Sequence, residues 1–64
     1  MKVYVVKECL NGSGVTISVF AKYEDAVSHA EDLAEYGAFE RDGDAWYNDD
    51  DYETIEVEEH KVIQ

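Results

Sequence analysis

Carboxylates are the one kind of side chain in this sequence dense enough to do chemistry together. Residues 40–59 contain ten acidic residues against Arg41 alone, a net charge of −9. Clustered carboxylates can bind a divalent cation, transfer protons in an active site, or present negative charge to a basic partner. The spacing of the acids, and the elements that hold them, decide between these uses.

A calcium-binding loop is the most specific of the three possibilities. An EF-hand register beginning at Asp42 places Trp46 at a ligand position and Tyr47 where the sharp turn requires glycine. The sequence therefore predicts no EF-hand, and we expect neither a metal nor a cofactor. A weak divalent-ion site at residues 49–51 stays open as an alternative.

The sequence offers neither a set of catalytic side chains nor enough residues to form a substrate cleft. Cys9 is the only cysteine, and its place beside Leu10 on an expected strand is typical of a small buried hydrophobic residue. His29 is expected on a helix surface and His60 beside acidic residues, so neither is placed to activate Cys9. A chain of 64 residues buries only about 60% of its unfolded surface, too little for a core and a deep cleft. We expect no catalytic residues and no enzyme.

The total charge narrows the class of partner. Sixteen acids against five basic residues give a net charge of −11, which argues against direct binding to nucleic acid or to an anionic membrane. Residues 1–22 carry a net charge of +2 and residues 23–64 one of −13, so the acidity is a patch. We expect a basic protein partner, although a merely solvated face of an acid-rich protein stays open. One cysteine and no long apolar run predict a cytoplasmic protein.

The elements that must hold these acids can be read from periodicity. Residues 2–10 are expected to form a strand, residues 11–14 a hairpin loop, and residues 15–21 a second strand with its apolar residues on one face. Apolar spacing changes after Tyr23 and predicts a helix over residues 22–36, with Ala26 and Ala30 towards a sheet and Gly37 as its left-handed cap.

The acidic remainder reads as β structure. Residues 38–41 and 44–47 flank an Asp42-Gly43 turn, and a strand runs from Tyr52 to about Ile63 with Glu56 and Glu58 on one face. The fold class we predict is α+β: one domain, residues 1–64, with an antiparallel sheet and one helix in the order β-β-α-β-β, with room for one extra short strand. Trp46 is expected in the core.

The acids then form a regular surface. Thr54, Glu56 and Glu58 make a row along the last strand at about 6.7 Å spacing, comparable to the regular phosphate rows of DNA. Residues 49–51 are expected to extend this row, and the outer face of the helix to add Glu24, Glu31, Asp32 and Glu35. Tyr47 and Tyr52 bracket the polar loop and are candidates for interface contacts.

A family resemblance rests on three segments: the opening MKVYVV at residues 1–6, YEDA at residues 23–26, and NDDDYE at residues 48–53. With its size and acidity, the chain resembles the small anti-CRISPR proteins of phages and mobile elements. That resemblance implies a DNA mimic that binds a Cas effector, a type I Cascade complex, where target DNA or its PAM would dock. The partner-binding residues expected on this hypothesis are Asp42, Asp44, Tyr47, Asp49, Asp50, Asp51, Tyr52, Glu53, Glu56 and Glu58.

A different class of function stays open beside the inhibitor. The chain could be a small phage-encoded accessory or regulatory module that binds its partner through a sheet edge or an apolar face, with the acids only facing solvent. On that hypothesis a proline between Tyr52 and Val57 disrupts binding, whereas reversal of the acids does not. For the inhibitor itself we expect a monomer.

Overall fold

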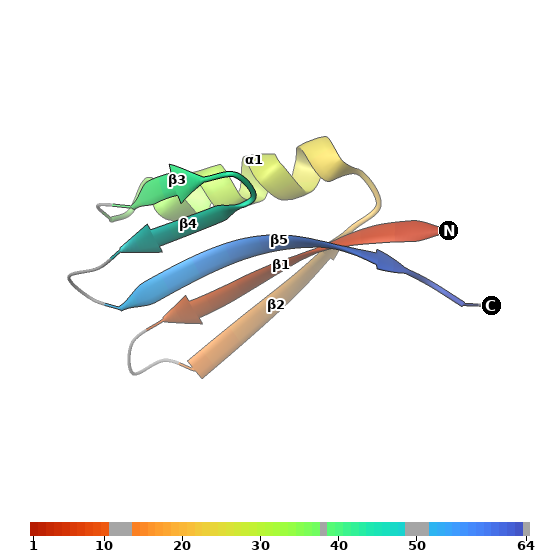
Figure 1. Ribbon diagram of the computed structural model, residues 1–64, viewed down its shortest axis with the longest axis horizontal. Helices are drawn as coiled ribbons and strands as arrows, with labels where there is room; N and C mark the ends of the chain where they lie inside the picture. Colours follow the sequence, from red (N-terminus) through yellow and green to blue (C-terminus); the bar gives the residue numbers. More distant parts are fainter. Residues whose placement is uncertain (11–13, 38, 49–51, 64) are drawn as a thin grey trace.

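One antiparallel sheet and one helix make up the fold (Figure 1). The computed structural model describes residues 1–10, 14–37, 39–48 and 52–63. Its elements are β1 (Lys2–Leu10), β2 (Gly14–Phe20), α1 (Tyr23–Ala34), β3 (Glu40–Asp42), β4 (Ala45–Asn48) and β5 (Glu53–Lys61). The α+β class is therefore confirmed. The order is β-β-α-β-β-β, one strand more than β-β-α-β-β, because the extra short strand, β3, is present.

The strands lie in the spatial order β2-β1-β5-β4-β3, so β5 is inserted between the two hairpins. It pairs with β1 from Lys2 opposite Lys61 to Cys9 opposite Thr54, and with β4 on its other side. A partner strand therefore has no open edge at β5, and a proline between Tyr52 and Val57 would interrupt pairing inside the sheet itself. The free edges of the described sheet are β2 and β3.

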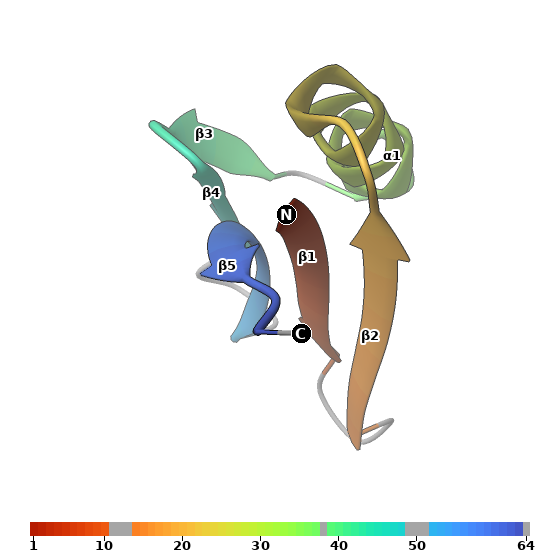
Figure 2. The same ribbon diagram turned by 90° about the vertical axis from the view of Figure 1, so that its right-hand side faces the viewer.

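The core lies between the helix and one face of the sheet (Figure 2). Ile55 and Val57 on β5 alternate with the acids, as predicted, and point under the helix together with Val6 and Trp46. Two fully buried alanines on the helix, Ala26 and Ala30, lack bulk and let α1 pack closely on the strands. The expected core position of Trp46 is confirmed.

The helix ends earlier than its sequence pattern suggests. Its last residue is Ala34, and the following turns close with tighter bonds from the Tyr36 N–H to the Leu33 carbonyl and from the Gly37 N–H to the Ala34 carbonyl, both 3.3 Å. Gly37 does not adopt the positive φ of a left-handed cap, so that expectation is wrong. Positive φ occurs instead at the hairpin glycines, Gly14 at 79° and Gly43 at 64°.

The opposite face of the sheet, which we call the open face, is covered by no element of the described chain. Val6 points towards the helix, so Cys9, three positions further along β1, falls on the open face and is only half-buried. The expectation of a buried Cys9 is therefore wrong. The apolar set of β2, namely Val15, Ile17 and Val19, also lies on the open face and is exposed.

Candidate acidic interface

Strand register brings acids from β3 and β5 to the same face of the sheet. One row across the open face runs from Asp42 on β3 through Ala45 to Glu56 on β5, and continues to Lys7 on β1 and Ile17 on β2. Residues directly opposite one another on neighbouring strands project from the same face. Asp42 and Glu56, fourteen positions apart in the sequence, are thus separated by only one intervening strand.

The neighbouring row places an aromatic ring among these acids. Glu40 lies opposite Tyr47, and Tyr47 lies opposite Thr54. The Tyr47 hydroxyl donates a hydrogen bond to a Glu40 carboxylate oxygen at 3.4 Å. Tyr47 is half-buried, so its ring is partly available at the surface. The open face therefore combines carboxylates with one amphipathic aromatic residue.

Four of the carboxylates on this face form what we call the open-face acid cluster: Glu40, Asp42, Glu56 and Glu58. Along each strand the two acids are separated by one residue, about 6.7 Å, and β3 lies roughly 10 Å from β5 because only β4 intervenes. The cluster is thus a grid set by backbone geometry. Its spacing depends on strand pairing rather than on flexible side chains.

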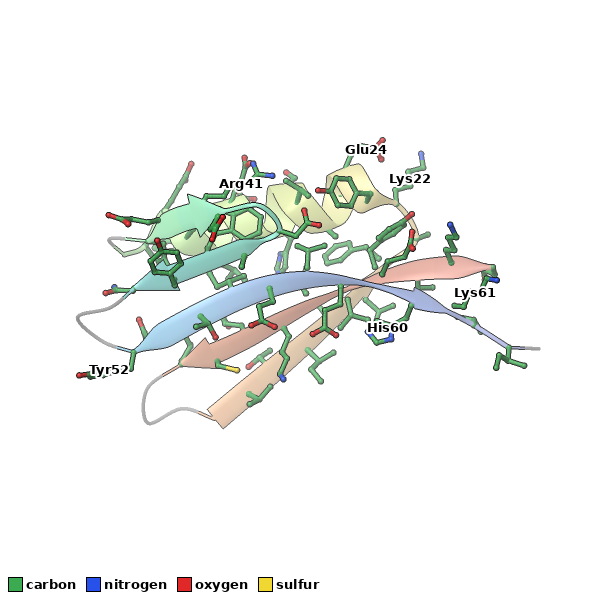
Figure 3. All side chains as sticks on the ribbon, in the orientation of Figure 1. Lys22, Glu24, Arg41, Tyr52, His60 and Lys61 are labelled. Atoms are coloured by element: carbon green, nitrogen blue, oxygen red, sulfur yellow. The ribbon has the colours of Figure 1, made fainter. Side chains whose placement is uncertain are left out.

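Little positive charge neutralises the grid. Arg41, the only basic residue on β3, points to the other face, where its guanidinium contacts a Glu31 oxygen at 3.0 Å and lies over the Trp46 ring (Figure 3). Glu58 accepts a contact from His60 at 3.0 Å between Nε2 and Oε2. Among the described residues no ion pair involves Glu40, Asp42 or Glu56, although Lys7 lies opposite Glu56.

Other acids expected in the same surface lie elsewhere. Asp44 faces the helix side, where its carboxylate accepts a hydrogen bond from the Tyr23 hydroxyl. Glu53 alternates with Thr54 and therefore also faces the helix side, opposite the buried Asn48. The helix lies over the covered face of the sheet (Figure 2), so the acids expected from its outer surface do not share the open face with Glu56 and Glu58.

The loop before β5 is described only at its last residue. Tyr52 is 85% exposed, has a positive φ of 55°, and points away from the start of β5 (Figure 3). Its ring is accessible to a partner but lies at the end of the sheet. The predicted contacts of Asp49, Asp50 and Asp51 fall outside the described residues, so the interface rests on the strands.

Sequence reasoning missed two members of this surface. Glu40 was not expected among the partner-binding residues, although its alternation with Asp42 on a strand could have placed both on one face. Lys7 was not expected near the acids, because only the register between β1 and β5 shows that it faces Glu56. The observed surface is therefore more acidic at β3 and less acidic towards β1.

Metal binding has little geometric support here. No group of three or more His, Cys, Asp or Glu side chains in residues 1–10, 14–37, 39–48 and 52–63 is arranged to hold a metal ion.

No helix in the same part of the chain is long and apolar enough to cross a membrane. The chain matches no family model, no curated protein and no solved structure.

Proposed function

We propose that this chain is an inhibitor that occupies the basic nucleic-acid site of another protein with its open-face acid cluster, and so acts as a DNA mimic. The observation that carries the proposal is the grid of Glu40, Asp42, Glu56 and Glu58 on an uncovered face of a chain with a net charge of −11. DNA offers one phosphate per roughly 3.4 Å of rise on each strand, and lysine and arginine sites read that regular charge. A rigid carboxylate grid offers such a site a comparable pattern.

The partner we propose is a Cas effector, in particular a type I Cascade complex at its site for target DNA or the PAM. The resemblance to small anti-CRISPR proteins supports this choice, and the cytoplasm of a bacterial host is where such an inhibitor acts. The chain contacts the protein and not the nucleic acid, because its own charge repels phosphate. It needs no cofactor, because blocking a site requires no chemistry.

Tyr47 gives the charged grid a second kind of contact. Charged groups chiefly set approach and specificity, whereas aromatic residues at the centre of an interface supply much of its binding energy. The ring of Tyr47 lies between the acids of β3 and those of β5 and is held by its neighbours on both sides. We expect Tyr47→Ala to weaken binding even at salt concentrations that screen the acids.

Neutralising the grid without changing its shape tests the proposal. We expect the triple variant Asp42→Asn, Glu56→Gln, Glu58→Gln to lose at least about tenfold in inhibition, because its carboxylates no longer attract the basic site. Glutamine is preferable to lysine at Glu56, since Lys7 lies opposite. The measurement is binding of labelled target DNA by a purified guide-loaded Cascade complex, with the inhibitor titrated in at low and at high salt.

The control removes the same number of charges from the other side of the molecule. Glu24→Gln, Asp32→Asn and Glu35→Gln lie on the exposed helix surface and should leave inhibition within about threefold of the original. Equal losses in both triple variants would show that only net charge matters and would refute the mimic. If Cascade binds its DNA unhindered, capture from host lysate at low salt, followed by salt elution, identifies whether any other basic protein is the target.

A second candidate function, the accessory module that joins a partner through a sheet edge, is favoured by one observation. β2 is a long, uncharged free edge on the side of the sheet away from the acid grid. Binding through this edge would survive neutralisation of the grid.

A further inference from the structure

The two free edges of the sheet are built in opposite ways. β3 is three residues long, and all three, Glu40–Asp42, are charged. β2 is seven residues long and its sequence, GVTISVF, has neither a charged residue nor a proline. Short length and charge are the usual protection of an edge strand, whose unpaired N–H and C=O groups otherwise pair with another strand. β3 has this protection and β2 lacks it.

An apolar column accompanies the unprotected edge. Val15, Ile17 and Val19 are 56%, 61% and 61% exposed and all project from the open face of β2. Val5 and Cys9 lie opposite Val19 and Val15 on β1, with Lys7 between them opposite Ile17. Exposed apolar residues that are contiguous, rather than scattered, mark interaction sites. The column and the edge point to a partner that supplies both a strand and apolar side chains.

We propose that this partner is a second copy of the chain, joined by antiparallel pairing of the two β2 strands about a two-fold axis at Ile17. In that register Ile17 meets Ile17 of the copy, and Val15 meets Val19 of the copy, so the column is complementary to itself. An isologous contact of this kind closes as a dimer and does not grow into a fibre. The product is a continuous ten-stranded sheet, and this arrangement replaces the monomer expected from the sequence.

The distribution of charge favours a second copy at this edge. Two chains of net charge −11 repel at most surfaces, yet residues 14–20 carry no charge and residues 1–22 carry a net +2. In the dimer the two β5 strands are five strand spacings apart, about 24 Å, several times the Debye length of about 8 Å at physiological salt. The acids of β3 and β5 therefore lie on the far side of each half-sheet from the β2–β2 contact.

The helix leaves the edge open. α1 packs mainly on β1 and β5, and Figure 1 shows β2 running out past the helix towards the lower left. The polypeptide enters the helix only after Phe20, at one end of the strand, where the Phe20 ring packs against His29 at a centroid distance of 5.2 Å. The rest of β2 can therefore accept a neighbouring strand without moving the helix.

Sedimentation equilibrium from micromolar to millimolar concentration tests the dimer. We expect the wild-type mass to rise towards twice the chain's 7.3 kDa, and Ile17→Glu to stay at the monomer mass, because two charges would meet on the two-fold axis. Glutamate is chosen because Lys7 lies opposite Ile17 and tolerates it. The matched control is Ile63→Glu, the same change at a residue that is 94% exposed and outside β2, which should still dimerise.

Two results of the sedimentation experiment would contradict the dimer. A wild-type chain that remains monomeric to millimolar concentration, or an Ile17→Glu variant that dimerises as well as the control, overturns the proposal. A wild-type monomer that captures an unrelated strand at β2 overturns it in favour of the accessory module. The test is independent of the proposed function, since Ile17→Glu leaves the open-face acid cluster intact.

A cross-link tests the register. In a Cys9→Ser background, Ile17→Cys should form a disulfide-linked dimer with oxidised glutathione, because opposite residues have Cα atoms about 4.5–5.5 Å apart, within the range for a disulfide. Val15→Cys in the same background should not, since it faces Val19 of the copy. A cross-link through position 15 but not through position 17 would show that the strands pair in a different register and refute the two-fold axis at Ile17.

Discussion

The two hairpins that flank β5 are attached to the molecule in different ways. The β3–β4 hairpin is fastened to the helix side by the buried Trp46, by the contact of Arg41 with Glu31, and by the hydrogen bond from Tyr23 to Asp44. The β1–β2 hairpin contributes Val6 to the core, but its outer strand meets the helix chiefly near Phe20. The short hairpin thus makes polar side-chain contacts with the helix and presents acids, whereas the long one leaves an apolar edge free. The ion pair and the hydrogen bond to the helix are both made by the shorter hairpin, β3–β4.

Removing the apolar anchor of the short hairpin should have the largest effect. Trp46→Ala deletes a buried ring and is expected to cost about 3–5 kcal/mol of unfolding free energy, most of what a domain of this size has. Urea denaturation followed by circular dichroism measures it. Tyr36→Ala, at a fully exposed ring, is the control and should change stability by less than about 0.5 kcal/mol. Equal effects would contradict the anchoring role of Trp46.

The cationic link should matter less. Arg41→Ala loses both the contact with Glu31 and the guanidinium over Trp46, 4.8 Å from the ring centroid, and should cost about 1 kcal/mol because both partners of the ion pair are half-exposed. Arg41→Ala also removes the hydrogen bond that its Nε–H donates to the Gly43 carbonyl at 2.8 Å, and a double-mutant cycle with Glu31→Ala isolates the ion pair from the other two contacts. A coupling near zero between Arg41 and Glu31 would assign the effect of Arg41→Ala to the ring contact and this hydrogen bond.

The smallest effect concerns Tyr23 and appears at high pH. Its hydrogen bond to Asp44, then desolvation and the charge of Asp44, raise the pKa of the Tyr23 hydroxyl above its ordinary value of 10.0. A raised pKa means that the bond contributes stability below the ordinary pKa and that this contribution is lost as pH rises through the folded-state value. Tyr23→Phe should remove a component of the tyrosinate absorbance that appears above pH 10.0 and flatten this pH dependence.

Asp44→Asn is the companion variant for that titration. It removes the charge but keeps an acceptor, so the pKa of Tyr23 should fall back towards its ordinary value. A tyrosinate titration curve that is unchanged in Asp44→Asn would show that the hydroxyl of Tyr23 does not sense Asp44.

Sequence periodicity predicted the local elements well. β1 has the expected bounds, and the alternation of Ile55 and Val57 with Glu56 and Glu58 gave the two faces of β5 correctly. Periodicity of two reports which residues share a face, because alternate side chains project the same way. On β5 it therefore separated Ile55 and Val57 from Glu56 and Glu58 correctly.

Periodicity within one strand does not predict which strands pair or which face of the sheet the helix covers. β1 has valines on both faces, so its pattern does not say which face the helix covers, and the position of Cys9 was missed. The central place of β5 depends on pairing with β1 between residues 45 to 59 positions apart in the sequence. The acid surface was accordingly predicted in part: Asp42, Tyr47, Glu56 and Glu58 share a face, whereas Asp44 and Glu53 lie on the other.

The central position of β5 also has a consequence for folding kinetics. Its pairing with β1 joins residues as distant as Lys2 and Lys61, and the Val62 N–H adds a bond of 2.9 Å to the Met1 carbonyl. Such non-local pairs require a long loop to close, at a cost in chain entropy, before the strand contacts that offset this cost can form. This sheet should therefore assemble far more slowly than a helical bundle of equal length. Until residues 53–61 insert, the β1–β2 ribbon has two open edges. A nascent chain on the ribosome is therefore more prone to aggregate than the finished protein.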